Sequence, residues 1–178
     1  MAKIILLIVI TFSLTSCVTE KELLSKTTNS AMILDSNLNG TYSYVNVGIE
    51  EKADLPNVFL SYKRIKFDDE RNSSLDSLQT RIEYDGDKKL KITLLDSISV
   101  IQTFDLRVKD RGNYLSVKRK LFLIPIPFLF YFHKERKAII FSDNNGDLHI
   151  IEGEEQSIWI FMAGGYSFTN HHKFEKKE

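Results

Sequence analysis

Apolar and polar residues alternate one by one through much of the middle of the chain, and this alternation constrains the fold more than any other feature. Within residues 98–108, five apolar residues fall on one side of an extended chain: Ile98, Val100, Phe104, Leu106 and Val108. Such alternation is typical of a strand in a sheet that has one buried face and one wet face. The middle of the chain is therefore expected to form antiparallel strands.

Two turn signals divide these strands into hairpins. Asp85-Gly86 and Asn145-Gly146 each stand between two alternating segments, and both dipeptides suit the positive φ values of tight hairpin turns. No helical pattern alternates with the strands, as a parallel sheet would require. We therefore expect an all-β fold of about eight or nine sequential strands. Its predicted form is an antiparallel up-and-down barrel or half-barrel, preceded by a short helical or irregular segment.

The N-terminus has the order of a secretory signal peptide. Lys3 precedes the apolar segment Ile4 to Phe12, and small or polar residues follow as far as Ser16. A membrane-spanning helix needs about 20 apolar residues, and this segment is much shorter. We therefore predict a cleaved signal peptide rather than a membrane-spanning helix.

The end of this segment, Leu14-Thr15-Ser16-Cys17, resembles the bacterial lipobox. The resemblance implies cleavage before Cys17 and acylation of its thiol and new amine. The alternative is an ordinary secreted protein with a spare thiol. Val18 stands where an aspartate favours inner-membrane retention in enterobacterial lipoproteins, so we expect attachment to the cell envelope, more at the outer than at the inner membrane.

Four segments follow from these signals. Residues 1–16 are the expected lipoprotein signal peptide, 17–38 a lipid-anchored tether, 39–168 a single β-barrel-like domain and 169–178 a charged tail. The chain has 24 Lys and Arg against 24 Asp and Glu. Nucleic-acid binding needs a clustered basic footprint, so we expect no nucleic-acid partner.

Several short motifs resemble small lipid-anchored proteins of Bacteroidetes with lipocalin-like architecture. The motifs are "LNGTYSY", "YLSVKRK" before a proline-aromatic run, "SDNNGDLHI" and a Gly-Gly pair after the last apolar strand. The resemblance implies a lipocalin-like barrel and transfers no catalytic residue. Tyr42 stands where a lipocalin proper has the tryptophan of its Gly-x-Trp motif.

Leu121 to Phe132 contains twelve residues without a charge, and Pro125 and Pro127 interrupt it. Because of the prolines, neither a spanning helix nor one long central strand fits. Three readings remain open. The run forms a core strand bent by the prolines, it lines an apolar ligand pocket, or it is an exposed loop that dips into lipid or docks a partner.

Arg119 shares the predicted apolar side of its strand with Leu115 and Val117. A buried arginine needs a partner, which is either a ligand carboxylate or a structural neighbour. If the domain holds a ligand, five candidates follow: Arg119, Phe122, Phe128, Phe130 and Trp159.

Searches for catalytic and metal motifs find none in the sequence. Asp143 to Glu154 fits part of the spacing of a calcium-binding loop, but Leu148 replaces the required glycine. There is no G-x-S-x-G, H-E-x-x-H or Walker motif. We therefore expect no enzyme activity, no cofactor and no metal.

Two functions remain as expectations. The first is a lipid-anchored module of the cell envelope that binds an apolar small molecule or a lipid. The second is a non-enzymatic structural or interaction protein that docks onto an envelope protein complex through an exposed aromatic face.

Overall fold

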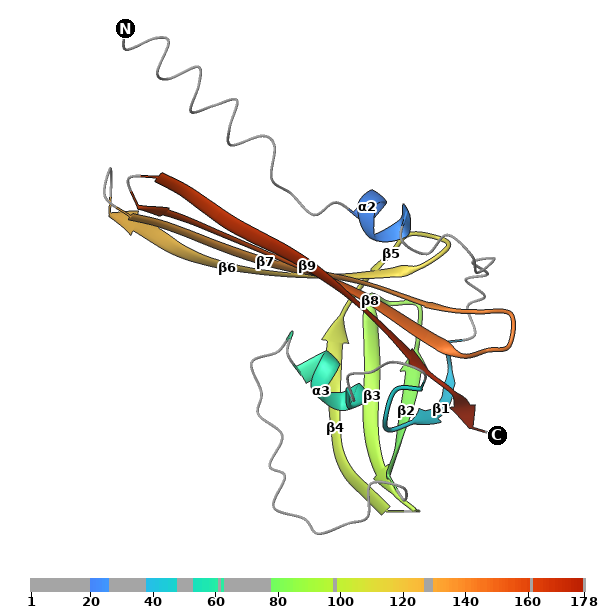
Figure 1. The fold of residues 1–178 in the computed structure, drawn as a ribbon. Coiled ribbons are helices and arrows are strands. Elements are labelled where there is room, and N and C mark those ends of the chain that lie inside the picture. The colour runs from blue at the N-terminus through green and yellow to red at the C-terminus, as the bar shows by residue number, and fades with distance from the viewer. Residues whose placement is uncertain are drawn as a thin grey trace, which may run out of the picture.

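The computed structural model describes residues 20–25, 38–47, 53–60, 62, 78–97, 99–126, 130–160 and 162–177. Within these residues the chain forms two five-stranded antiparallel sheets and two short helices. The helices are α2 (Glu20–Ser25) and α3 (Leu55–Leu60). The expected all-β antiparallel fold is therefore confirmed (Figure 1).

The first sheet, sheet A, has the strand order β10-β1-β2-β3-β4. Its strands are β1 (Gly40–Ser43), β2 (Leu78–Tyr84), β3 (Lys89–Asp96), β4 (Ser99–Arg107) and β10 (Lys176–Lys177).

The second sheet, sheet C, has the order β5-β6-β7-β8-β9. Its strands are β5 (Lys109–Asp110), β6 (Leu115–Ile126), β7 (Phe130–Ser142), β8 (Leu148–Ile160) and β9 (Met162–Phe174).

The chain passes between the sheets at two corners. Val108 separates β4 from β5, and its backbone amide donates to the Lys88 carbonyl at 2.9 Å. Glu175 separates β9 from β10, and its carbonyl accepts from the Ser43 amide at 2.8 Å. The strand order is thus that of an up-and-down barrel opened at two corners. The sheets are not closed into a barrel, so the half-barrel form of the prediction fits and the closed form does not.

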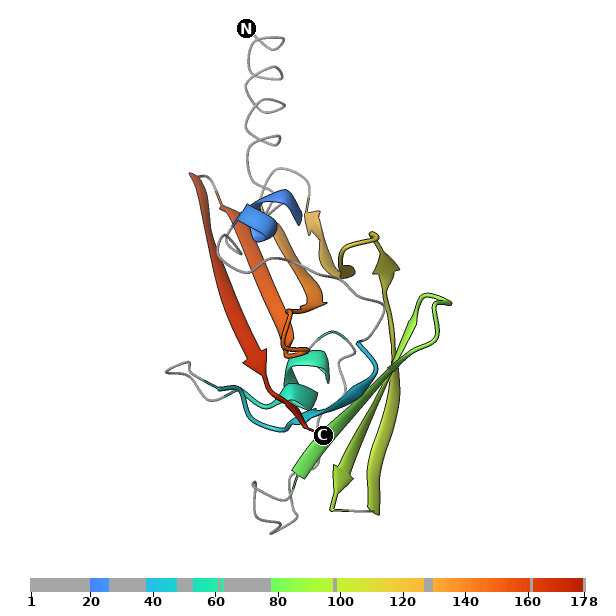
Figure 2. The same ribbon diagram turned by 90° about the vertical axis from the view of Figure 1, so that its right-hand side faces the viewer.

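Side chains from both sheets and from α3 fill the space between the sheets. The buried residues are Leu38, Tyr42, Leu55, Val58, Phe59, Ile82, Leu90, Ile92, Phe104, Leu106, Val108, Leu115, Val117, Ala138, Ile140, Leu148, Ile150 and Phe174. Helix α3 lies between the two sheets (Figure 2). Burial raises the pKa of Tyr42 to about 12, and its hydroxyl donates to the Leu38 carbonyl at 3.0 Å. The described part of the sandwich interior is therefore a packed core.

The two predicted turns form with the expected backbone. Gly86 and Gly146 adopt φ values of 81° and 83°, which a glycine tolerates without strain. In the second turn, Asp143 Oδ1 accepts hydrogen bonds from the amides of Asn145 and Asp147 at 2.9 and 3.0 Å. The Asp143 carboxylate thus stabilises a hairpin turn, as the Asn145-Gly146 signal predicts.

The alternation in β4 is interrupted by a β-bulge. Its ladder to β3 shifts register and leaves Ile101 as the extra residue. One inserted residue reverses the faces of the residues on one side of it. The prediction that Val100 shares the buried face of Phe104 is therefore wrong, because Val100 is 63% exposed. Ile98 lies outside the described residues.

Two segments that the sequence places outside the β domain are part of the packed fold. Residues 169–174, expected in a charged tail, continue β9, and Phe174 enters the core because it alternates with the outward-facing Lys173. In the expected tether, α2 packs on the outer face of sheet C. Its Leu23 is fully buried against Ile139, Phe141 and Ile151.

Candidate functional site

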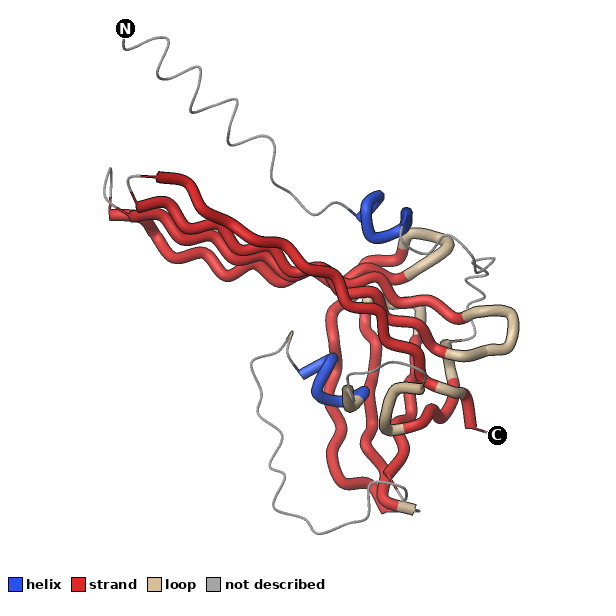
Figure 3. The backbone as a smooth tube through the Cα atoms, viewed as in Figure 1, coloured by secondary structure: helices blue, strands red, loops and turns tan. Residues whose placement is uncertain are grey.

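Sheet C is longer than the core requires. Strands β6 to β9 have 12 or 13 residues each, whereas those of sheet A have nine or fewer. The four long strands continue as a single layer beyond the part that sheet A covers (Figures 1 and 3). We call this part the projecting end, and define it as residues 119–126, 130–136, 154–160 and 162–168. It is the candidate functional site.

Two uncharged runs of the sequence, residues 121–132 and 156–170, meet in the projecting end. Phe132 pairs with Ile158, and Tyr131 pairs with Trp159. Trp159 also pairs with Ala163 on the last strand of the sheet. Four strand segments without a charged residue therefore lie side by side at one end of one sheet. At about 3.3 Å per residue, the uncharged strand segment 121–126 is roughly 20 Å long.

Four of the five predicted ligand-binding residues have strand positions in this end. Arg119 pairs with Arg136, Phe122 with His133, and Phe130 with Ile126. Trp159 belongs to the same sheet. The structure brings these positions onto one surface element, and it describes their backbone alone. Phe128 lies outside the described residues.

An exposed aromatic pair stands on the inner face of the projecting end, the face that bears the core farther along the sheet. The rings of Tyr166 and Phe168 stack with centroids 6.2 Å apart and planes 12° from parallel. They are 52% and 39% exposed. The Tyr166 hydroxyl donates to Gln156 Oε1 at 2.6 Å, which holds the ring in place. Sheet A does not reach this pair, so an apolar surface remains open on the face where the core ends.

A charged band on the same face begins where the core ends and reaches the aromatic pair, because Glu154 stands directly opposite Phe168. Glu154, only 3% exposed, binds Arg136 and also Lys134, whose Nζ lies 2.5 Å away. Burial acts to raise the pKa of the Glu154 carboxyl, but hydrogen bonds from Lys134 and Arg136 outweigh it and lower that pKa. The carboxylate thus stays ionised between two cations.

A second polar group closes the core at the edge of this band. His172 Nε2 lies 3.2 Å from Glu152 Oε2, and both side chains are largely buried. The Tyr62 hydroxyl is buried near the same carboxylate. Burial, and then the charge of Glu152, raise the Tyr62 pKa well above its ordinary value. His172 Nδ1 has no hydrogen-bond partner among the described residues.

Sequence reasoning missed Arg136 and Glu154. The signal was present, because Arg136 alternates with Ala138 and Ile140 in the same way that Arg119 alternates with Val117. The partner could not be identified, because the pairing of Arg136 with Glu154 depends on the register of β7 and β8.

A chain of three polar side chains lies on the outer face of sheet C. Asp143 Oδ2 lies 3.1 Å from His149 Nε2, and His149 Nδ1 lies 2.8 Å from His171 Nε2. His149 is buried and stacks on Phe141. When both rings are neutral, His149 donates to Asp143 and accepts from His171.

No family model, curated protein or solved structure matches this chain. Among the described residues, no helix is long and apolar enough to cross a membrane. No group of three His, Cys, Asp or Glu side chains in the described ranges is arranged to hold a metal ion.

Proposed function

We propose that this protein is a lipid-anchored module of the bacterial cell envelope that binds a lipid or another apolar small molecule on the inner face of its projecting end. The observation that carries the proposal is the exposed Tyr166–Phe168 stack beside four uncharged strand segments. Contiguous apolar surface that is exposed to solvent is uncommon on monomeric proteins and often marks a binding site.

The arrangement of charge favours an amphipathic ligand. The aromatic pair offers an apolar surface, and Lys134, Arg136 and Glu154 lie beside it in the same cross-strand rows of β7 and β8. A lipid has the same combination of parts, with an apolar body and a polar end. Because the core between the sheets is packed, the projecting end is a better candidate for the ligand-binding site than a cavity between the sheets.

Membrane attachment through Cys17 and a location at the outer membrane are part of this proposal. They are supported by the signal-like N-terminus and by the lipobox resemblance at residues 14–17. Burial of acyl chains contributes about 0.8 kcal/mol per CH₂, so two or three long chains hold a protein on a membrane durably. The motifs "LNGTYSY", "YLSVKRK", "SDNNGDLHI" and the Gly-Gly pair support likeness to lipid-anchored Bacteroidetes proteins of lipocalin-like architecture. We propose no enzyme activity.

Native purification tests the proposal. The full chain is extracted from its own membranes in a mild detergent, and bound small molecules are identified by mass spectrometry. We expect one lipid or apolar molecule at near-stoichiometric amount, and less of it with the Tyr166→Ser/Phe168→Ser variant. Equal recovery from the two proteins would contradict binding at this surface.

A second candidate function has its own observation. Strand β9 is an edge strand of 13 residues with no strand beyond it in sheet C among the described residues. A long open edge is a template for strand addition by a partner. The alternative proposal is docking onto an envelope protein, and cross-linking in intact cells would then recover one stoichiometric protein partner.

A further inference from the structure

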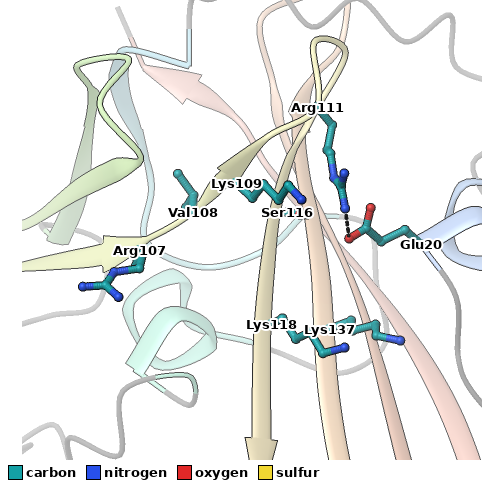
Figure 4. A pocket seen from close by; sticks show the side chains of 8 residues that line it. All are labelled: Glu20, Arg107, Val108, Lys109, Arg111, Ser116, Lys118 and Lys137. Atoms are coloured by element: carbon teal, nitrogen blue, oxygen red, sulfur yellow. Dashed lines mark hydrogen bonds and ion pairs between the residues drawn. The ribbon is translucent and has the colours of Figure 1, made fainter.

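A basic pocket lies on the outer face of sheet C, beside α2. Its volume is about 490 Å³, and Figure 4 shows its lining. Eight residues line it: Glu20, Arg107, Val108, Lys109, Arg111, Ser116, Lys118 and Lys137. Five of the eight are cationic and one is anionic. The whole chain has equal numbers of acidic and basic residues, so this is a local excess of positive charge.

The ion pairs around the pocket leave part of this charge uncompensated. Glu20 binds Arg111 at 3.1 Å. Glu135, which is buried, binds both Lys118 and Lys137, at 3.0 and 2.7 Å. Lys109 has no ion pair among the described residues.

The geometry of the ladder gathers these cations. Lys118 stands directly opposite Lys137 across β6 and β7, and Lys109 stands opposite Ser116 across β5 and β6. Like charges opposite one another in a sheet are destabilising. Glu135 offsets this repulsion between Lys118 and Lys137, whereas Lys109 lines the same hollow without an ion pair among the described residues. An anionic ligand would compensate that charge.

Helix α2 limits how far this pocket can lie from the proposed anchor. Glu20 lines the pocket and follows Cys17 by three residues. Three residues span at most about 11 Å when fully extended. The polar headgroup layer on each side of a bilayer is roughly 5 to 7 Å thick. If Cys17 is acylated, the rim of the pocket therefore lies at or next to the headgroups.

We infer that this pocket binds the phosphate of an anionic phospholipid headgroup in the leaflet that holds the acyl chains. Basic side chains near an anionic membrane surface attract it. This contact would turn the outer face of sheet C and α2 toward the membrane. The inner face, with Tyr166 and Phe168, would then face away from the membrane. The inference rests on the proposed anchoring at Cys17 and deepens it.

Binding of a short-chain lipid tests this inference. The full protein in a neutral detergent is titrated with dihexanoyl phosphatidylglycerol, with dihexanoyl phosphatidylcholine and with inorganic phosphate. We expect saturable binding of phosphatidylglycerol alone. The variant Lys109→Gln/Lys118→Gln should weaken it at least tenfold, and it should fold normally because Arg111 keeps Glu20 and Lys137 keeps Glu135.

A matched control removes the same charge elsewhere. Arg81→Gln/Lys91→Gln on sheet A also removes one cation without an ion pair among the described residues and one paired cation, since Lys91 binds Glu83 at 2.8 Å. This control should bind phosphatidylglycerol within twofold of wild type. An equal loss in the control would overturn the inference, because it would show a general charge effect.

The remaining outcomes are equally decisive. Inorganic phosphate that binds as tightly as phosphatidylglycerol would assign the pocket to a free anion. An acidic peptide is titrated in the same way, and its binding without that of the lipid would assign the pocket to a protein partner. Absence of all binding would remove the site. Failure of the proposed function would appear instead in the lipid recovered with Tyr166→Ser/Phe168→Ser, which this titration does not measure.

Discussion

Tyr166 and Phe168 stack against each other on the inner face of sheet C, and both rings are exposed to solvent. Two residues apart on β9, they share a face with the buried core residue Phe174. The same face of one strand is thus core at one end and open apolar surface at the other.

The double variant Tyr166→Ser/Phe168→Ser should reduce the amount of lipid that purifies with the protein about five- to tenfold. Both rings are exposed, so the free energy of unfolding should change by less than about 1 kcal/mol. Mass spectrometry measures the lipid, and urea unfolding measures stability. Val100→Ser, at an exposed apolar residue on sheet A, is the control and should retain the lipid.

Glu154→Gln should destabilise the protein, because it leaves Lys134 and Arg136 without their shared carboxylate. Both cations keep partial exposure, so we expect a loss of about 2 to 3 kcal/mol, below the usual cost for a fully buried pair. Urea unfolding measures it. Glu83→Gln breaks the exposed pair with Lys91 and should cost at most about 1 kcal/mol. Similar losses in both variants would contradict a structural role for the buried band.

Stability should fall as pH drops from 7 to 5, and His171 should contribute to the fall. Partial burial, and then the charges of His149, His172 and Lys173, lower the pKa of His171. As the pH falls, His171 is therefore protonated first in the unfolded chain, near pH 6.5. The unfolded state gains stability relative to the folded state until the pH falls below the folded pKa of His171. Urea unfolding of wild type and His171→Gln at pH 8, 7, 6 and 5 measures the effect. The variant should show a shallower decline, and equal declines would contradict the prediction.

Below about pH 4.5 a separate loss should follow from the carboxyl groups. Burial opposes ionisation of Asp143, but hydrogen bonds from His149 and from the backbone of Asp147 and Asn145 lower its pKa. A group with a lowered acidic pKa stabilises the fold above its unfolded pKa, and this stabilisation is lost as the folded group is protonated. His171→Gln should leave this lower-pH transition in place, which separates it from the histidine effect.

Cys17→Ala should abolish acylation. Cells fed an alkyne-labelled fatty acid should label the wild-type protein and not the variant, and the wild type alone should appear at the mass expected for cleavage before residue 17. Labelling of the variant, or cleavage of it as in wild type, would contradict the lipoprotein assignment.

The sequence predicts the strand class and the turns because local chemistry determines them. Asp85-Gly86 and Asn145-Gly146 form their turns through glycines with positive φ, and the alternation on either side identifies the buried faces of β2, β3 and most of β4. The β-bulge at Ile101 is not predictable in this way, since one inserted residue leaves no composition signal.

The division into two sheets depends on long-range geometry. Val108 is a buried apolar residue in an alternating run, and nothing local indicates that the ladder breaks there. The candidate site was predictable in kind but not in place. The uncharged run at 121–132 was evident, but its alignment with residues 157–160 depends on the register of β7 and β8.

Site-specific photo-cross-linking in living cells tests the central claim most directly. A benzophenone amino acid replaces Tyr166 in one protein and the exposed Val100 of sheet A in another. After irradiation, the mass of the purified protein should increase by that of one lipid or apolar molecule at position 166 and not at position 100. Cross-links from position 166 only to protein, or equal lipid cross-linking at both positions, would contradict a lipid-binding surface at the projecting end.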